Sequence, residues 1–229
     1  GSEGRLPAQS RQAGTFVSQT LAWYDRTIDA ALLGTPGGRL RRRGPQVTRR
    51  PRHPLRVLES RRLTLVAATP ELLAADLAGP EVFAEALQAE VPADWPPELF
   101  GFTVMHAAQV QLQNPAEHGW SVWYLLSRKH ERPIAIGMCQ LKSMPDMAGS
   151  VEITYSILEK YRTQGYATEA VARLVTWAFS HQNVVEITAE TLPFLRQSIR
   201  VLEKNGLRYC GPGSEQGVVK YALQKSTHI

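Results

Sequence analysis

The apolar positions of this chain change their spacing several times between residues 57 and 224. Short apolar runs separated by polar connections, with apolar and polar residues alternating in 151–158, predict strands over 62–68, 120–128, 132–142, 150–158 and 184–192, with two short ones near 207–211 and 218–224. Recurrence at helical spacing predicts helices over 69–79, 80–90, 98–113, about 165–181 and 195–206. This mixed order predicts an α/β (α+β) fold, in which helices cover a single sheet.

The first 56 residues differ in composition from the rest of the chain. They hold eleven arginines, no lysine and three acidic residues, which is a net charge of +8; the whole chain carries +5, so residues 57–229 carry −3. A helical pattern over 15–34 is followed by 35–54, which is rich in Gly, Pro and Arg and has too few apolar residues to form a core. We therefore divide the chain into a basic extension, 1–56, and a folded domain, 57–229.

Three roles for this extension stay open. It can be a passive or artefactual addition, or its 15–34 helix can dock on the domain or on a second subunit, as in a homodimer. Contact with the phosphates of a nucleic acid is the alternative that we favour least.

The overall composition, 43% hydrophobic and 21% charged, is typical of a soluble globular protein. No apolar run approaches the roughly 20 residues that span a bilayer, and the N-terminus lacks the apolar segment of a signal peptide. We therefore expect a cytoplasmic protein without membrane contact. The two cysteines, Cys139 and Cys210, fit neither a disulfide framework nor a metal cluster, and we expect no metal.

The segment EKYRTQGYATEAV, residues 159–171, lies between a predicted strand and a predicted helix. The first N–H groups of a helix have no partner within it, and together with the helix dipole they suit an anion. Gly165 allows close approach of a ligand and a positive φ, and Ala167 leaves room for it. Thr168 and Arg162 add a hydroxyl and a charge. The turn is therefore either a cradle for a pyrophosphate or a simple glycine turn.

The sequence resembles the GNAT N-acetyltransferase family at three places. Arg162, Gly165 and Ala167 fill the defining positions of the family's acetyl-CoA motif, Arg/Gln-x-x-Gly-x-Gly/Ala. AETLPFLRQSIRVLEKNGLRYCG (189–211) resembles the family's fifth strand, fourth helix and sixth strand. LESRRLTLVAATPELLAADL (58–77) resembles the opening of the branch that contains the ribosomal-protein N-terminal (alanine/serine) acetyltransferases. The resemblance implies a GNAT fold: one mixed, mostly antiparallel sheet of about seven strands, splayed between the fourth and fifth and flanked by helices.

The resemblance also implies that acetyl-CoA is the co-substrate. In the family, backbone N–H groups of this loop hold the pyrophosphate of coenzyme A, and the pantetheine arm pairs with the end of the fourth strand. The coenzyme-binding residues that the resemblance implies are Ile157, Leu158, Arg162, Thr163, Gln164, Gly165, Tyr166, Ala167 and Thr168.

Glu152 is the candidate general base for acetyl transfer, a reaction in which the attacking ammonium must first lose a proton. It shares one face of its strand with Thr154 and Ser156. The resemblance implies that a Glu at this point acts through a water. The alternatives are Glu190 as base, or a solvent-facing Glu152 that pairs with a Lys or an Arg.

Ser198 is the candidate acid, because in the pattern QSIRVLEK it matches the family's serine near the coenzyme sulfur. The alternative is a serine that only bonds to the backbone of its helix. One position departs from the family: Leu195 stands where an asparagine usually hydrogen-bonds the coenzyme or a water. Three tyrosines are further candidate donors that the sequence does not distinguish: Tyr155, Tyr166 and Tyr209.

These residues favour an N-acetyltransferase that acts on a primary amine, either a protein N-terminus or a small molecule. Leu195 favours the alternative, a non-catalytic acyl-CoA-binding module whose basic arm contacts RNA or a ribosome, whereas Glu152 and Ser198 together favour the enzyme. By family analogy the loop VPADWPP (91–97) flanks the acceptor site. Trp95 of this loop either lines that site or packs on its own prolines.

Overall fold

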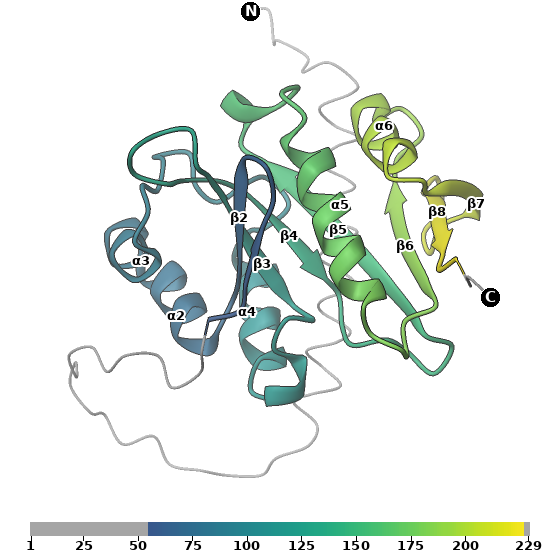
Figure 1. Cartoon of the computed structure of the whole chain (residues 1–229), viewed down its shortest axis with the longest axis horizontal. Helices are drawn as coiled ribbons and strands as arrows, with labels where there is room; N and C mark the ends of the chain where they lie inside the picture. Colours follow the sequence, from purple (N-terminus) through teal and green to yellow (C-terminus); the bar gives the residue numbers. More distant parts are fainter. Residues whose placement is uncertain (1–54, 227–229) are drawn as a thin grey trace, which may run out of the picture. The chain divides into compact units, whose positions relative to one another are not determined.

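The structure is a computed structural model that describes residues 55–226 (Figure 1). The predicted helix over 15–34 and the segment 35–54 lie outside the described residues. Arg56, which we placed in the extension, contacts the folded domain. Its carbonyl accepts the Ala67 N–H at 2.9 Å, and its guanidinium lies 5.4 Å from the ring centroid of Trp177. The folded part of the chain therefore includes residue 56.

The strands of the described chain form one sheet of eight, in the order β1-β2-β3-β4-β5-β6-β8-β7. Only β5 and β6 are parallel neighbours; every other pair is antiparallel. The predicted mixed, mostly antiparallel sheet is thus confirmed, with β1 as the additional strand, too short for alternation to reveal it. The strands are β1 Val57–Glu59, β2 Leu63–Ala67, β3 Val122–Ser127, β4 Ile134–Leu141, β5 Ser150–Ile157, β6 Glu186–Thr191, β7 Arg208–Pro212 and β8 Val219–Gln224.

Five α-helices flank the sheet within residues 55–226. The first helix begins after a threonine cap: Thr69 Oγ1 accepts the Leu72 N–H at 3.2 Å, and Pro70 occupies a first-turn position where no N–H partner is needed. The helix predicted over 98–113 begins at residue 102 instead, because Gly101 is extended after the proline-rich loop. The helices are α2 Pro70–Ala78, α3 Pro80–Leu87, α4 Phe102–Gln111, α5 Tyr166–Phe179 and α6 Arg196–Lys204, with short 3-10 helices η1 Pro115–Glu117 and η2 Glu159–Tyr161.

Neighbouring residues of β3 pack on opposite layers and so show which helices cover which face. Trp123 packs on Trp177 of α5, with ring centroids 5.3 Å apart. The next residue, Tyr124, packs on Phe83 of α3 at 4.8 Å. Side chains alternate along a strand, so α5 and its neighbour α6 cover one face of the sheet, and α2, α3 and α4 cover the other (Figure 1).

The sheet opens between its two parallel strands. β5 and β6 pair over only three residues of β5, of which the last, Glu152, lies opposite Thr188. Both strands continue beyond this point but diverge, as Figure 1 shows. The predicted splay is confirmed, and Glu152 lies where it begins.

Candidate active site

The turn between β5 and α5 presents a row of backbone donors. Within residues 55–226, no acceptor receives the main-chain N–H groups of the six residues from Thr163 to Thr168. The ladder of α5 begins only with the Glu169 N–H, which donates to the Gly165 carbonyl at 3.1 Å. Six unpaired donors at the positive end of a helix suit an anion with several oxygens, such as a pyrophosphate.

Two residues with positive φ shape this turn. Gly165 has φ 81° and ψ 6°, and Thr163 has φ 61°. A left-handed backbone at a β-branched residue costs on the order of 1–3 kcal/mol, and such strain clusters at ligand-binding turns. A Cβ added at Gly165 would meet Arg62 Nη2 at 3.4 Å, an ordinary contact. In the free chain this position therefore requires glycine for its conformation rather than for its space.

Arg162, expected to contribute charge to the coenzyme site, is engaged within the chain. Its Nε donates to the Ile157 carbonyl at 2.9 Å, and its Nη2 donates to Glu98 Oε2 at 3.1 Å. The guanidinium thus ties the turn to the end of β5 and to the segment before α4, and Glu98 offsets its charge. The donors that the turn offers to an anion are therefore chiefly its backbone N–H groups.

The free edge of β5 faces the opening toward β6. The Glu152 carbonyl accepts the Lys142 N–H at 3.0 Å, and the Leu158 N–H donates to the Ile136 carbonyl at 2.9 Å. The even-numbered residues of this strand therefore direct their main-chain groups toward β4. Tyr155 and Ile157 therefore point theirs into the opening, where no strand of the described chain pairs with them. The Leu158 carbonyl accepts from Tyr161 at 2.9 Å. The Ile157 carbonyl accepts from Arg162, so its N–H is the group that remains for a pantetheine contact, whereas both main-chain groups of Leu158 already have partners.

The Glu152 side chain forms an ion pair on the face of β5 that points away from α6. Its Oε1 pairs with Lys142 Nζ, and the two side chains are 26% and 14% exposed. Burial raises the pKa of Glu152; Lys142 opposes this shift, and the charge of Glu190 adds to it. The paired lysine of the alternative interpretation is present, yet the carboxylate is mostly buried. A carboxylate with a raised pKa at the splay is suited to general-base chemistry.

Glu190, the rival base, is engaged by the β7–β8 turn. Ser214 donates its N–H to Glu190 Oε1 at 2.9 Å and its hydroxyl to Oε2 at 2.7 Å. These two bonds tie the end of β6 to the turn, which gives Glu190 a structural role. Of the two carboxylates, Glu152 is therefore the better candidate base.

The structure pairs Ser198 with one of the three candidate tyrosines. The Tyr155 hydroxyl donates to the Ser198 carbonyl at 3.0 Å and lies 3.1 Å from Ser198 Oγ. Burial raises the pKa of Tyr155, so its hydroxyl keeps its proton at neutral pH. Tyr155 and Glu152 are three residues apart on one strand and point to opposite faces of the sheet. The serine–tyrosine pair thus lies on the α6 face, and the candidate base lies on the other.

Leu195 is the N-cap residue of α6 and makes no side-chain capping bond. An asparagine at an N-cap can accept a hydrogen bond from the first turn of the helix, which leucine cannot do. The departure from the family pattern therefore removes a local hydrogen-bonding group beside Ser198 without preventing the helix from forming.

Trp95 packs on aromatic residues of the α2–α4 face rather than only on its own prolines. Its ring lies 5.5 Å from Phe83 and 6.2 Å from Tyr124, centroid to centroid, and its Nε1 donates to Asp76 Oδ1 at 2.9 Å. Burial raises the pKa of Asp76 to about 6, against the opposing hydrogen bond from Trp95. Asp76 Oδ2 and the Tyr124 hydroxyl are both buried and make no hydrogen bond in the described chain, although each side chain shifts the pKa of the other.

Neither cysteine is paired: Cys139 is buried and Cys210 is exposed. Among residues 55–226 there is no group of three or more His, Cys, Asp or Glu that could hold a metal ion. No helix in the same part of the chain is long and apolar enough to cross a membrane.

Comparisons with known proteins agree with this arrangement. The family described as "Acetyltransferase (GNAT) domain" matches residues 62–208. An uncharacterized N-acetyltransferase of Bacillus subtilis (strain 168), YjdG, is 27% identical over 150 residues, which cover 66% of this chain and 88% of that protein. The structure of a ribosomal-protein-S5-alanine acetyltransferase from Vibrio fischeri has a TM-score of 0.53 at 14% identity, covering 75% of this chain and 97% of that one. RimL, a ribosomal L7/L12 alpha-N-protein acetyltransferase solved with coenzyme A, has a TM-score of 0.50 at 17% identity, covering 74% and 98%. The chain belongs to the GNAT acetyltransferase family, whose acetyl donor is acetyl-CoA.

Proposed function

We propose that this protein transfers the acetyl group of acetyl-CoA to a primary amine, of a protein N-terminus or of a small molecule. The observation that carries the proposal is the row of six unpaired N–H groups from Thr163 to Thr168 at the start of α5, next to the open edge of β5. The row suits the pyrophosphate. The open edge suits the amides of the pantetheine arm, through Tyr155 and Ile157.

In the proposed mechanism, residues on opposite faces of β5 carry out the two proton transfers. Glu152 accepts the proton of the ammonium through a water, and the neutral amine nitrogen then bonds to the acetyl carbon. As the carbon–sulfur bond breaks, the Ser198 hydroxyl supplies a proton to the departing sulfur. The new amide nitrogen loses its second proton, which restores the serine hydroxyl through solvent, so the products are a neutral amide and the coenzyme thiol. The Tyr155 hydroxyl donates to the Ser198 carbonyl and lies 3.1 Å from Ser198 Oγ, and these contacts hold the serine in position. Holding the amine and the thioester together lowers the barrier of the reaction by up to about 7–11 kcal/mol.

The relatives support the class of acceptor but do not identify it. Two of the similar solved structures have names that place their acceptors on ribosomal proteins. A protein N-terminus is therefore one acceptor to test, beside small-molecule amines. A non-catalytic acyl-CoA-binding module, the alternative suggested by Leu195, has no supporting observation elsewhere in the described residues.

Calorimetry with acetyl-CoA and a matched pair of glycine variants tests the coenzyme site. Gly165 and Gly217 both have positive φ, 81° and 85°. An added Cβ would meet nothing within 4 Å at Gly217 and only Arg62 Nη2, at 3.4 Å, at Gly165. Valine should strain both turns alike, but only Gly165→Val should obstruct the pyrophosphate and abolish binding. If Gly165→Val binds acetyl-CoA as tightly as the parent, the coenzyme site is not here.

Thiol release from acetyl-CoA, measured against a panel of amines and N-terminal peptides, tests the reaction itself. We expect release with at least one acceptor class and none with N-terminally blocked peptides. Tight coenzyme binding without release for any amine would instead favour the binding module.

A further inference from the structure

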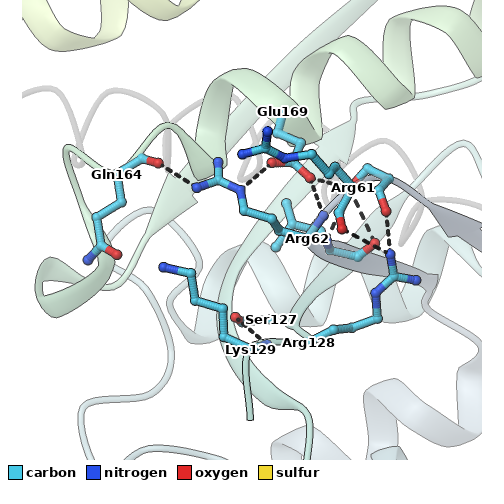
Figure 2. A network of polar contacts seen from close by, with 9 residues as sticks. Arg61, Arg62, Ser127, Arg128, Lys129, Gln164 and Glu169 are labelled. Carbon is cyan, nitrogen blue, oxygen red and sulfur yellow. Dashed lines mark hydrogen bonds and ion pairs between the residues drawn. The ribbon is translucent and has the colours of Figure 1, made fainter.

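Arg62 links the hairpin between β1 and β2 to the start of α5. Arg62, the residue before β2, meets three residues of the coenzyme turn and the first turns of α5, as Figure 2 shows for its polar contacts. Its Nη1 donates to the Gln164 carbonyl at 3.0 Å, its Nε donates to Glu169 Oε2 at 2.7 Å, and its guanidinium lies 4.5 Å from the ring centroid of Tyr166.

The Glu169 carboxylate is fully occupied by this hairpin. Its Oε1 accepts the Arg62 N–H at 2.6 Å and the Ser60 hydroxyl at 2.8 Å, while Oε2 accepts from the Arg62 guanidinium. Burial alone would raise the pKa of Glu169, but these hydrogen bonds outweigh it and lower the pKa. The carboxylate is therefore charged at neutral pH. Its charge is neutralised by Arg62 instead of repelling an anion at the N-terminus of α5.

The contact with Gln164 fixes the direction of a donor in the turn. The peptide bond between Gln164 and Gly165 is trans and planar, so its C=O and its N–H point in opposite directions. Because Arg62 holds the Gln164 carbonyl on the hairpin side, the Gly165 N–H points away from the hairpin. Gly165 is one of the six residues whose N–H has no acceptor in the described chain.

We propose that Arg62 is a positioning residue for the coenzyme: it aims the Gly165 N–H at the pyrophosphate and cancels the charge of Glu169 beside it. This inference rests on the proposed function, because it assumes that the turn binds coenzyme A. Arg62 acts through the backbone of the turn. A lysine keeps the charge but lacks the planar fork that bonds Gln164 and Glu169 at once.

Arg61 provides a matched control for charge. Its side chain is exposed and forms no hydrogen bond or ion pair within residues 55–226, so Arg61→Gln removes one positive charge next to the site and leaves the contacts of Arg62 intact. Arg62→Lys and Arg62→Gln should each raise the Kd for coenzyme A roughly tenfold to hundredfold, the scale of one or two charge-assisted hydrogen bonds. Arg61→Gln should leave the Kd nearly unchanged at physiological salt.

A second acetyl donor separates positioning from a general structural role. S-acetylpantetheine carries the thioester but no pyrophosphate. We expect the Arg62 variants to lower kcat/KM for acetyl-CoA and to leave kcat/KM for S-acetylpantetheine at the parent value. An equal loss with both donors would make Arg62 merely structural and overturn the inference.

The double variant Arg62→Gln/Glu169→Gln provides an independent readout, because it removes the buried charge that a single Arg62 variant leaves unpaired. We expect its melting temperature to recover toward that of the parent while its affinity for coenzyme A stays weak. Recovery of both together would overturn the inference. If the parent binds coenzyme A and Arg62→Lys binds it equally well, the inference alone fails. If the parent binds no coenzyme A, the proposed function fails with it.

Discussion

Replacement of Asp76 by asparagine should stabilise the protein at neutral pH but not at acidic pH. Asp76 is largely buried between α2 and the loop of Trp95, and burial raises its pKa from 3.8 to about 6. The folded chain therefore binds this proton more tightly than the unfolded chain. The resulting stabilisation is complete below pH 3.8 and is lost as the pH rises through about 6.

The size of the effect follows from the shift. From 3.8 to about 6 is roughly two units, and each unit corresponds to about 1.4 kcal/mol. Ionisation of Asp76 at pH 8 therefore costs the folded state about 3 kcal/mol. Asparagine is neutral at every pH, and its Oδ1 can still accept from Trp95 Nε1. In a domain of this size, about 3 kcal/mol corresponds to a difference of about 6–12 °C in melting temperature.

Thermal denaturation of parent and Asp76→Asn, followed from pH 4 to pH 8, measures this difference. We expect the melting temperatures to be close at pH 4 and the variant to melt higher by pH 8. The exposed Asp94, in the same loop as Trp95, is the control: Asp94→Asn should show a difference that hardly changes with pH. A flat difference for Asp76→Asn, or a variant that melts lower than the parent at pH 8, would refute the reasoning.

The remaining predictions concern the base and the extension. Glu152→Gln should lower kcat by about 100-fold or more, the scale of general-base catalysis, and should leave the affinity for acetyl-CoA in calorimetry unchanged. Because burial raises the pKa of Glu152, kcat/KM of the parent should rise with pH as this carboxyl loses its proton. The variant should not show this rise. Turnover unaltered at every pH would leave Glu190 as the candidate. A chain that begins at Leu55 keeps the contacts of Arg56 and should retain the melting temperature and coenzyme affinity of the full chain. A lower melting temperature or a changed sedimentation coefficient would show that residues 1–54 are structural. Loss of salt-sensitive RNA binding alone would show that they contact nucleic acid.

Apart from β1, the sequence by itself determined the order and type of the elements and the location of the glycine turn that we propose as the coenzyme site. Both are properties of short segments: alternation in 150–158 and helical spacing after Gly165 are visible within a few residues, because each side chain's direction follows from its own backbone. The Thr69 cap was predictable for the same reason. The face of Glu152 relative to Tyr155 also followed, since it depends only on their separation along one strand. Strand β1 was missed because three residues carry no measurable period.

The tertiary structure decided which of the candidate side chains meet. Tyr155 was one of three tyrosines until α6 placed Ser198 against its hydroxyl. Nothing local connects Glu190 with Ser214, or Arg162 with Glu98, and yet these contacts engage both side chains within the fold.

Arg62 and Glu169 are 107 positions apart in the sequence and come together only because the β1–β2 hairpin ends beside the start of α5. Strand register and helix packing set such long-range contacts. They are properties of the whole sheet, and no single segment of the sequence encodes them.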